Sequence, residues 1–160
     1  MGYNTSQVAQ SAQIAVDGGT GDLWTFAPMI PIIVSRWGYM VSTTTTGTPD
    51  FALDLRLAIG DDTGRIADWG GTITTVAGLA PGVGCQHTIG KTADGTQEGV
   101  FASGDSRPAG MVIPGEELVF QMPAGASQGD GFAFIEYEPL AGQGMYVLVT
   151  ELGVFTEYAA

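Results

Sequence analysis

The sequence predicts an all-β protein, an antiparallel β-sandwich of about eight strands arranged like a jelly roll and preceded by an N-terminal arm. Three observations predict this class. Apolar residues alternate with a period of two in several segments, which is typical of strands with one buried face. Clusters of Gly, Pro, Asp and Ser separate these segments at short intervals. Amphipathic helical patterns are nearly absent.

Residues 1–22 are predicted to precede the body as an arm and a joint. Residues 5–16 fit either a short helix or an extended arm, and their many Gln and Ser residues favour the arm. The glycine-rich residues 17–22 are typical of a flexible joint. We therefore expect arm and joint at residues 1–22 and one sandwich domain at residues 23–160. The arm is expected to lie free of the body, so that deleting residues 1–16 leaves the body folded.

The clearest strand of the body is predicted at residues 51–59. Its apolar residues of one parity are Phe51, Leu53, Leu55, Leu57 and Ile59. Leu53, Leu55 and Leu57 are expected to form the centre of the core. Asp54 and Arg56 have the other parity, which predicts a wet face with a weak surface ion pair. Replacing Asp54 by Ala is accordingly expected to cost about 1 kcal/mol or less.

The other strands are predicted from similar but shorter patterns. They are residues 23–26, 32–42, 72–76, 100–103, 118–122, 131–138 and 145–152. Trp37 lies in the most apolar of these runs and is assigned to the core, whereas the threonines at 43–46 are expected to form an exposed loop. An immunoglobulin-like sandwich is the alternative, but the chain lacks the Cys…Trp…Cys spacing of that fold.

The charge of the chain excludes several kinds of partner. Five Lys and Arg residues against 17 Asp and Glu residues give a formal net charge of −12. Binding to nucleic acid or to an anionic membrane needs a basic face, which five cations cannot supply. Only 14% of residues are charged and 44% are hydrophobic, a balance that predicts contact with other chains in a homo-oligomer. Neither a secretory signal nor a transmembrane helix is expected.

No group of residues predicts catalysis. Cys85 and His87 are the chain's only Cys and His, so a metal site of several such ligands cannot form, and we expect a loop cysteine beside a solvated histidine. His87, Asp94 and Ser106 follow the order of a serine-protease triad. Pro108, however, removes a backbone N–H close to Ser106, and only seven residues separate His87 from Asp94. The sequence therefore predicts neither an enzyme nor a cofactor.

The acidic clusters are interpreted without a metal. Residues 17–22, 61–68 and 94–98 carry several carboxylates that calcium could use, but the EF-hand spacing is missing and acidic residues are common in turns. Glu136 and Glu138 share one strand parity, which is expected to be a solvated sheet face rather than the carboxylate pair of a glycosidase. No metal ligand is predicted.

The order of segments resembles that of small jelly-roll decoration (cement) proteins, which coat the heads of tailed bacteriophages. The resemblance lies in the polar arm at 5–16, the Gly18-Gly19 joint, a β-body without cysteine pairs and the short tail at 154–160. It implies a non-enzymatic structural virion protein. Such a protein is assembled in the host cytoplasm and placed on the capsid surface as a homo-oligomer, with a trimer favoured. There it binds the major capsid protein and stabilises the head.

The contacts with these partners are expected at the two ends of the chain, where apolar residues belong to no clear body strand. These residues are Val8, Ile14, Val16, Val154, Phe155 and Tyr158. The alternative function is a carbohydrate-binding or receptor-binding sandwich module. It would use aromatic side chains such as Trp69, which is expected to be exposed in a loop.

Overall fold

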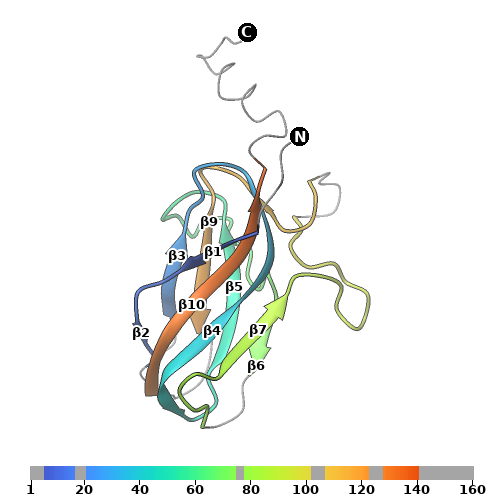
Figure 1. Ribbon diagram of the computed structural model, residues 1–160. Helices are drawn as coiled ribbons and strands as arrows, with labels where there is room; N and C mark the ends of the chain where they lie inside the picture. The colour runs from blue at the N-terminus through green and yellow to red at the C-terminus, as the bar shows by residue number, and fades with distance from the viewer. Residues whose placement is uncertain (1–5, 17–20, 75–77, 102–106, 123–127, 141–160) are drawn as a thin grey trace.

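The computed structural model describes residues 6–16, 21–74, 78–101, 107–122 and 128–140, and none of these is helical. They form two antiparallel β-sheets that pack face to face (Figure 1). The predicted β-sandwich is confirmed, with ten strands instead of about eight. Among the described residues, no helix is long and apolar enough to span a membrane.

Sheet A has six strands and sheet B has four. The main order of sheet A is β1 (Gln7–Gln10), β10 (Gln128–Pro139), β4 (Ile32–Thr46) and β7 (Gly84–Thr88). Two short strands complete it, β2 (Ile14–Ala15) beside β10 and β8 (Met111–Val112) beside β4. The order of sheet B is β3 (Gly21–Phe26), β9 (Glu117–Met122), β5 (Asp50–Arg56) and β6 (Thr72–Thr74). In Figure 1, β1, β10, β4 and β7 lie in front of β3, β9 and β5.

The eight longer strands have the connectivity of a jelly roll. They pair as nested hairpins: β1 with β10, β3 with β9, β4 with β7, and β5 with β6. Two further pairings, β10 with β4 and β9 with β5, join these hairpins into the two sheets. This folding of one long double strand over itself is the jelly-roll arrangement, so the expected topology is confirmed.

Aromatic side chains fill the space between the sheets. Trp37 and Tyr39 of sheet A meet Phe51 and Phe120 of sheet B, and each of the four is at most 1% exposed. The ring centres of Tyr39 and Phe51 are 4.8 Å apart, and those of Phe51 and Phe120 are 5.0 Å apart. The indole N–H of Trp37 donates a hydrogen bond to the Gly70 carbonyl (2.6 Å), which satisfies its polar atom inside the core. The predicted core position of Trp37 is confirmed.

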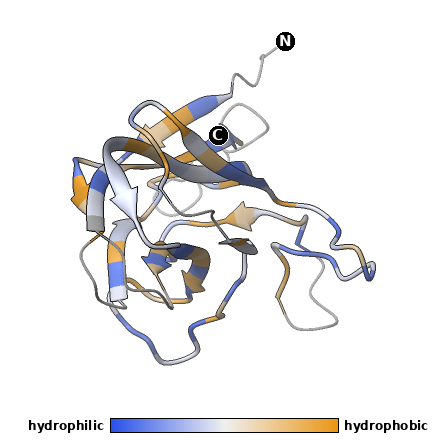
Figure 2. Ribbon diagram, turned by 90° about the horizontal axis from the view of Figure 1, so that it is seen from below, coloured by the Kyte–Doolittle hydropathy of each residue, from blue (hydrophilic) through white to orange (hydrophobic). Residues whose placement is uncertain are grey.

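Most of the predicted strands are present. Residues 23–26, 32–42, 118–122 and 131–138 lie in β3, β4, β9 and β10, and β6 covers the first part of 72–76. Figure 2 shows that these strands carry both hydrophobic and hydrophilic residues. The strands β7 and β8 were not predicted, because their residues lack that alternation. The predicted strand at 145–152 lies outside the described residues.

Two local predictions are wrong. The threonines at 43–46 continue β4 instead of forming a loop, and Thr45 is 1% exposed. The reason is a tertiary contact, since Thr45 exchanges hydrogen bonds with the backbone of Leu79. Residues 100–101 are not in a strand, and the rest of that predicted strand is not described.

The strand predicted at 51–59 ends three residues early. β5 stops at Arg56, so Leu57 is 44% exposed and Ile59 is 60% exposed, and the prediction of a core position for them is wrong. Residues 57–71, which we call the 57–71 loop, turn back along the edge of β5 that β9 does not occupy. Leu55 and Ile66 exchange two backbone hydrogen bonds there, at 2.8 and 3.0 Å. From this edge, Arg65 and Asp68 of the loop donate hydrogen bonds to the Asp54 carboxylate and so cover part of the face that was expected to be wet.

The expected detachment of the arm is also wrong for residues 7–16. β1 and β2 both pair with β10 and form an edge of sheet A. Backbone N–H groups of Ser11 and Val16 donate to Ala133 O (3.0 Å) and Gly129 O (2.7 Å), and Val16 is fully buried. These residues join the sheet because β10 offers them a free row of backbone groups. Residues 17–20 of the predicted joint are not described.

Candidate interaction surface

The outer face of sheet A carries an apolar surface that no described residue covers. It consists of Val8 of β1, Met40 of β4, and Phe132 and Phe134 of β10, and we call it the apolar platform. Val8 is 59% exposed and Met40 43% exposed, while the two phenylalanines are half-buried. Together with Gln10, these side chains line an open groove of about 260 Å³.

These side chains lie on the outer face of sheet A because successive residues of a strand point to opposite faces. In β10, Ala133 and Ile135 point into the core and are fully buried, so Phe132 and Phe134 between them point outward. Met40 likewise lies between buried neighbours of β4. Large apolar side chains on an outer sheet face are unfavourable in water unless another surface covers them. The arrangement is therefore suited to binding a second apolar surface.

Two glycines let the large side chains lie flat on the sheet. A Cβ atom at Gly38 would lie 2.9 Å from the ring of Phe134, too close for a substitution without movement. A Cβ atom at Gly84 would lie 3.3 Å from the Cε methyl of Met40. Each glycine thus leaves space for a side chain of the adjacent strand. A larger residue at either position would therefore displace a side chain of the platform.

The platform itself carries no charge, although the chain as a whole is strongly acidic. At its border, Arg36 Nη2 binds the Glu136 carboxylate at 2.8 Å and Arg36 Nη1 binds the side-chain oxygen of Gln86 at 3.2 Å. The hydrogen bond from Arg36 lowers the pKa of Glu136, which stays ionised and is neutralised by its partner. A partner that covers only the four residues of the platform therefore buries no charge.

The residues predicted to bind partners do not form one surface among the described residues. Val8 lies on the platform, so its predicted role stays a prediction. Ile14 is half-buried and packs against the core, and Val16 is fully buried in its own chain and is removed from the predicted surface. The residues Val154, Phe155 and Tyr158 lie outside the described part of the chain. The sequence analysis did not identify Met40, Phe132 and Phe134 as surface residues. A signal was available in β10, where aromatic residues occupy both parities, so that some of them must lie on the outer face.

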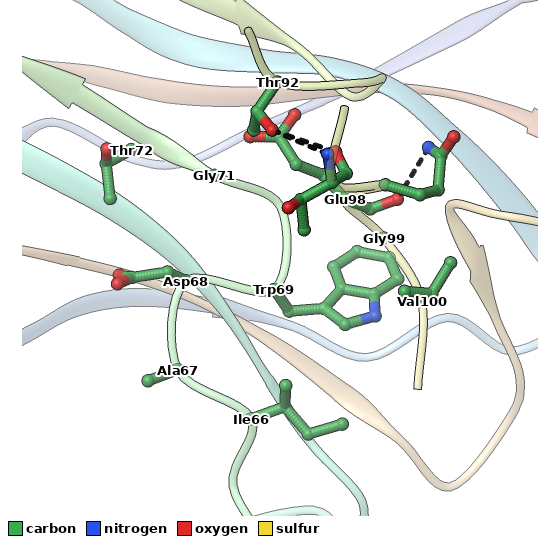
Figure 3. A pocket seen from close by; sticks show the side chains of 12 residues that line it. Ile66, Ala67, Asp68, Trp69, Gly71, Thr72, Thr92, Glu98, Gly99 and Val100 are labelled. Atoms are coloured by element: carbon green, nitrogen blue, oxygen red, sulfur yellow. Dashed lines mark hydrogen bonds between the residues drawn. The ribbon is translucent and has the colours of Figure 1, made fainter. Parts of the chain in front are cut away.

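A second hollow lies between the 57–71 loop and residues 92–100 (Figure 3). It has a volume of about 350 Å³, with Asp68 and Thr72 on one side and Trp69 and Val100 on the other. Trp69 is only 3% exposed, so the prediction of an exposed tryptophan is wrong. The loop turns its side chain into the core, and the Trp69 carbonyl accepts a hydrogen bond from Gly99 N (2.7 Å). Its ring face is not free for stacking on a sugar.

His87 lies in β7 and is bound to Glu98 of the neighbouring segment. Its Nε2 lies 2.8 Å from Glu98 Oε2, which also accepts a hydrogen bond from Gly90 N (3.2 Å). A Cβ atom at Gly71 would collide with both side chains, so glycine is needed where the loop passes them. The pair therefore fastens residues 90–98 to β7 beneath the 57–71 loop.

The catalytic groups considered from the sequence do not come together. Asp94 accepts hydrogen bonds from Thr92 and Thr96 in its own turn, whereas His87 binds Glu98. Cys85 lies on a strand instead of the expected loop, and burial raises the pKa of its thiol to about 11, so it stays protonated at neutral pH. Ser106 is not among the described residues. The described groups named here hold loops together, and none of them is an activated nucleophile.

Acidic residues on the outer face of sheet B are bound by two arginines. Arg65 binds Asp22 (2.8 Å) and Asp54 (2.7 Å), and Arg56 binds Asp62 (2.7 Å) and Glu117 (3.1 Å). The expectation that Asp54 and Arg56 lie on a wet face is therefore wrong: Asp54 is 1% exposed and Arg56 9%.

These contacts anchor the 57–71 loop to sheet B. Hydrogen bonds from Arg56 and Arg65 lower the pKa of Asp62. The described residues contain no group of three or more His, Cys, Asp or Glu that could hold a metal ion. The carboxylates of this region thus have a clear structural use as partners of the two guanidinium groups.

Comparisons of the chain with protein-family models, with curated proteins and with solved structures found no match. The jelly-roll topology and the apolar platform are therefore the two features on which a function can be proposed.

Proposed function

We propose that the chain is a non-enzymatic capsid decoration protein. It forms a homo-oligomer, with a trimer favoured, on the surface of a viral head, binds the major capsid protein and stabilises the shell. The observation that carries the proposal is the uncharged apolar platform on the outside of sheet A. Contiguous apolar surface of this kind is typical of sites where proteins associate.

The topology supports the same function. Double-sheet jelly rolls are used in viral capsids, in lectins and in cupins. Cupin-type metal binding needs several histidines, and this chain has one. Sugar stacking on the loop tryptophan would need an open ring face, and Trp69 is only 3% exposed. Shell assembly needs a surface that binds other protein, which the platform supplies.

The first test measures association of the full chain. Size-exclusion chromatography with light scattering should give an oligomer, and mass spectrometry of purified virus particles should find the chain in fixed ratio to the major capsid protein. A monomer that binds glycans on an array would instead support a carbohydrate-binding module and would contradict the proposal.

A pair of matched variants tests whether the platform is the contact. Met40→Asp places a charge on the platform and should abolish the oligomer, because burying an unpaired carboxylate is strongly unfavourable. Ile59→Asp is the control, since Ile59 is also an exposed apolar residue but lies beyond β5 at the start of the 57–71 loop. Far-UV circular dichroism checks that both remain folded. Equal association of the two variants would exclude the platform.

A further inference from the structure

The sequence that follows β10 is strongly apolar. Residues 145–149 are five consecutive apolar residues, Met-Tyr-Val-Leu-Val, and Leu152, Val154 and Phe155 follow them. Residues 141–150 contain no charged side chain. The apolar platform carries none either, so a contact between the two would bury no charge.

The path of the chain restricts where these residues can bind. The backbone of Leu140 still donates to Pro31 O (2.9 Å) at the end of β10. Because β1 and β4 already occupy both sides of β10, the residues after 140 cannot pair with β10 as the next strand of sheet A. They can lie across the outer face, where the apolar platform is the described groove lined mainly by apolar side chains.

The available length is sufficient for this contact. Phe134 precedes the end of β10 at Pro139 by five residues, a distance of about 17 Å along a strand. Val147 lies eight residues beyond Pro139, so an extended chain can carry it about 28 Å from the end of β10, which is more than the distance back to Phe134. Gly142 and Gly144 permit the change of direction that such a contact needs.

We infer that residues 145–149 of one copy bind the apolar platform of the next copy, an inference that rests on the proposed oligomeric function. Each copy then donates one segment and receives one. A head-to-tail contact of this type closes into a ring when its rotation permits, which agrees with the favoured trimer. The contact explains both why the platform is uncharged and why no described residue of the same chain covers it.

Disulfide trapping between two variants of the full chain tests this contact. One variant carries Met40→Cys, and the other carries Val147→Cys or Leu148→Cys; these two positions point to opposite sides of an extended segment. After mixing and mild oxidation, one of the two pairs should form a cross-linked heterodimer. Ile59→Cys replaces Met40→Cys as the matched control and should give about tenfold less product, because it lacks the local concentration that binding provides. Wild-type chain mixed with each tail variant measures any reaction of Cys85.

Each result either confirms or overturns the contact between copies. A heterodimer that forms with Met40→Cys and not with Ile59→Cys confirms the contact between copies. A disulfide found only within one chain of a Met40→Cys/Val147→Cys or Met40→Cys/Leu148→Cys double variant places the segment on its own platform and overturns the inference. An oligomer by light scattering that gives no cross-link also overturns it and leaves the proposed function in place. A monomer that neither cross-links nor associates overturns both.

Discussion

At the scale of single residues, Leu55 and Leu57 show how two positions of equal parity differ. Leu55 is fully buried in β5, whereas Leu57 is 44% exposed just beyond the strand. Leu55→Ala should lower the free energy of unfolding by about 2–5 kcal/mol, because it leaves a cavity in the core. Leu57→Ala should cost less than about 1 kcal/mol. Urea titration compares the two, and equal losses would contradict the observed end of β5.

Asp54 is the residue whose expected environment changes most. Its carboxylate accepts hydrogen bonds from Arg65 Nε (2.7 Å), Gln121 Nε2 (2.6 Å) and Asp68 N (2.8 Å). Asp54→Ala leaves these donors without their acceptor and should cost about 3 kcal/mol, well above the small loss that a wet face predicts. Asp94→Ala, in an exposed turn, is the control and should change the urea midpoint little. An Asp54 effect as small as that of Asp94 would show that the ion pairs add no net stability.

At the scale of elements, β1 and β2 behave as edge strands of the body. Deleting residues 1–16 removes their pairing with β10 and uncovers the apolar residues that pack against the buried Val16. We therefore expect a lower midpoint of thermal unfolding by circular dichroism, contrary to the expectation for a detached arm. Deletion of residues 1–5, which keeps β1 and β2, is the control and should lower the midpoint less. A midpoint unaffected by the longer deletion would show that β1 and β2 do not stabilise the body.

The 57–71 loop should be the most acid-sensitive element. Hydrogen bonds from Arg56 and Arg65 lower the pKa of Asp62. Burial raises the pKa of Glu117, but hydrogen bonds from Gly60 N, Thr25 and Arg56 lower it by more, so the pKa of Glu117 is also lowered. Both pKa values lie below those of the unfolded chain, so these groups stabilise the fold above about pH 4 and lose that effect as the pH falls further.

Hydrogen–deuterium exchange across this pH range measures the effect. Amides of the loop that are bonded to sheet B, such as Ile66 N, should lose protection before those of β4. Asp68 acts in the opposite direction, since burial and the charge of Asp54 raise its pKa, and Asp68→Asn removes its contribution. If the amides of the loop and of β4 lost protection at the same pH, the loop would not be a separate acid-sensitive element.

At the scale of the whole molecule, the net charge of −12 opposes association of copies. Raising the ionic strength from about 10 mM to about 150 mM shortens the range of this repulsion from about 30 Å to about 8 Å. Association through the uncharged platform should therefore become tighter with salt, which sedimentation velocity can measure. Weaker association at higher salt would indicate a contact held by ion pairs instead.

The sequence by itself determined the class of fold and the position of most long strands. Alternation with a period of two identifies β9, β10 and most of β5, and apolar runs bounded by turn residues identify β3 and β4; both patterns depend only on neighbouring residues. The same local pattern placed Trp37 in the core, because its strand is apolar on both sides of it. Punctuating turns then predicted a sandwich.

Only the tertiary structure decided which sheet faces are covered. Alternation shows that a strand has two different faces, but what lies on each face depends on residues far away in the sequence. The 57–71 loop buries Asp54, and residues 90–99 close over Trp69. No described segment covers Phe132 and Phe134, although they are as apolar as core residues. The apolar platform exists because burial is a property of packed elements, whereas a sequence pattern records only the order of side chains along one strand.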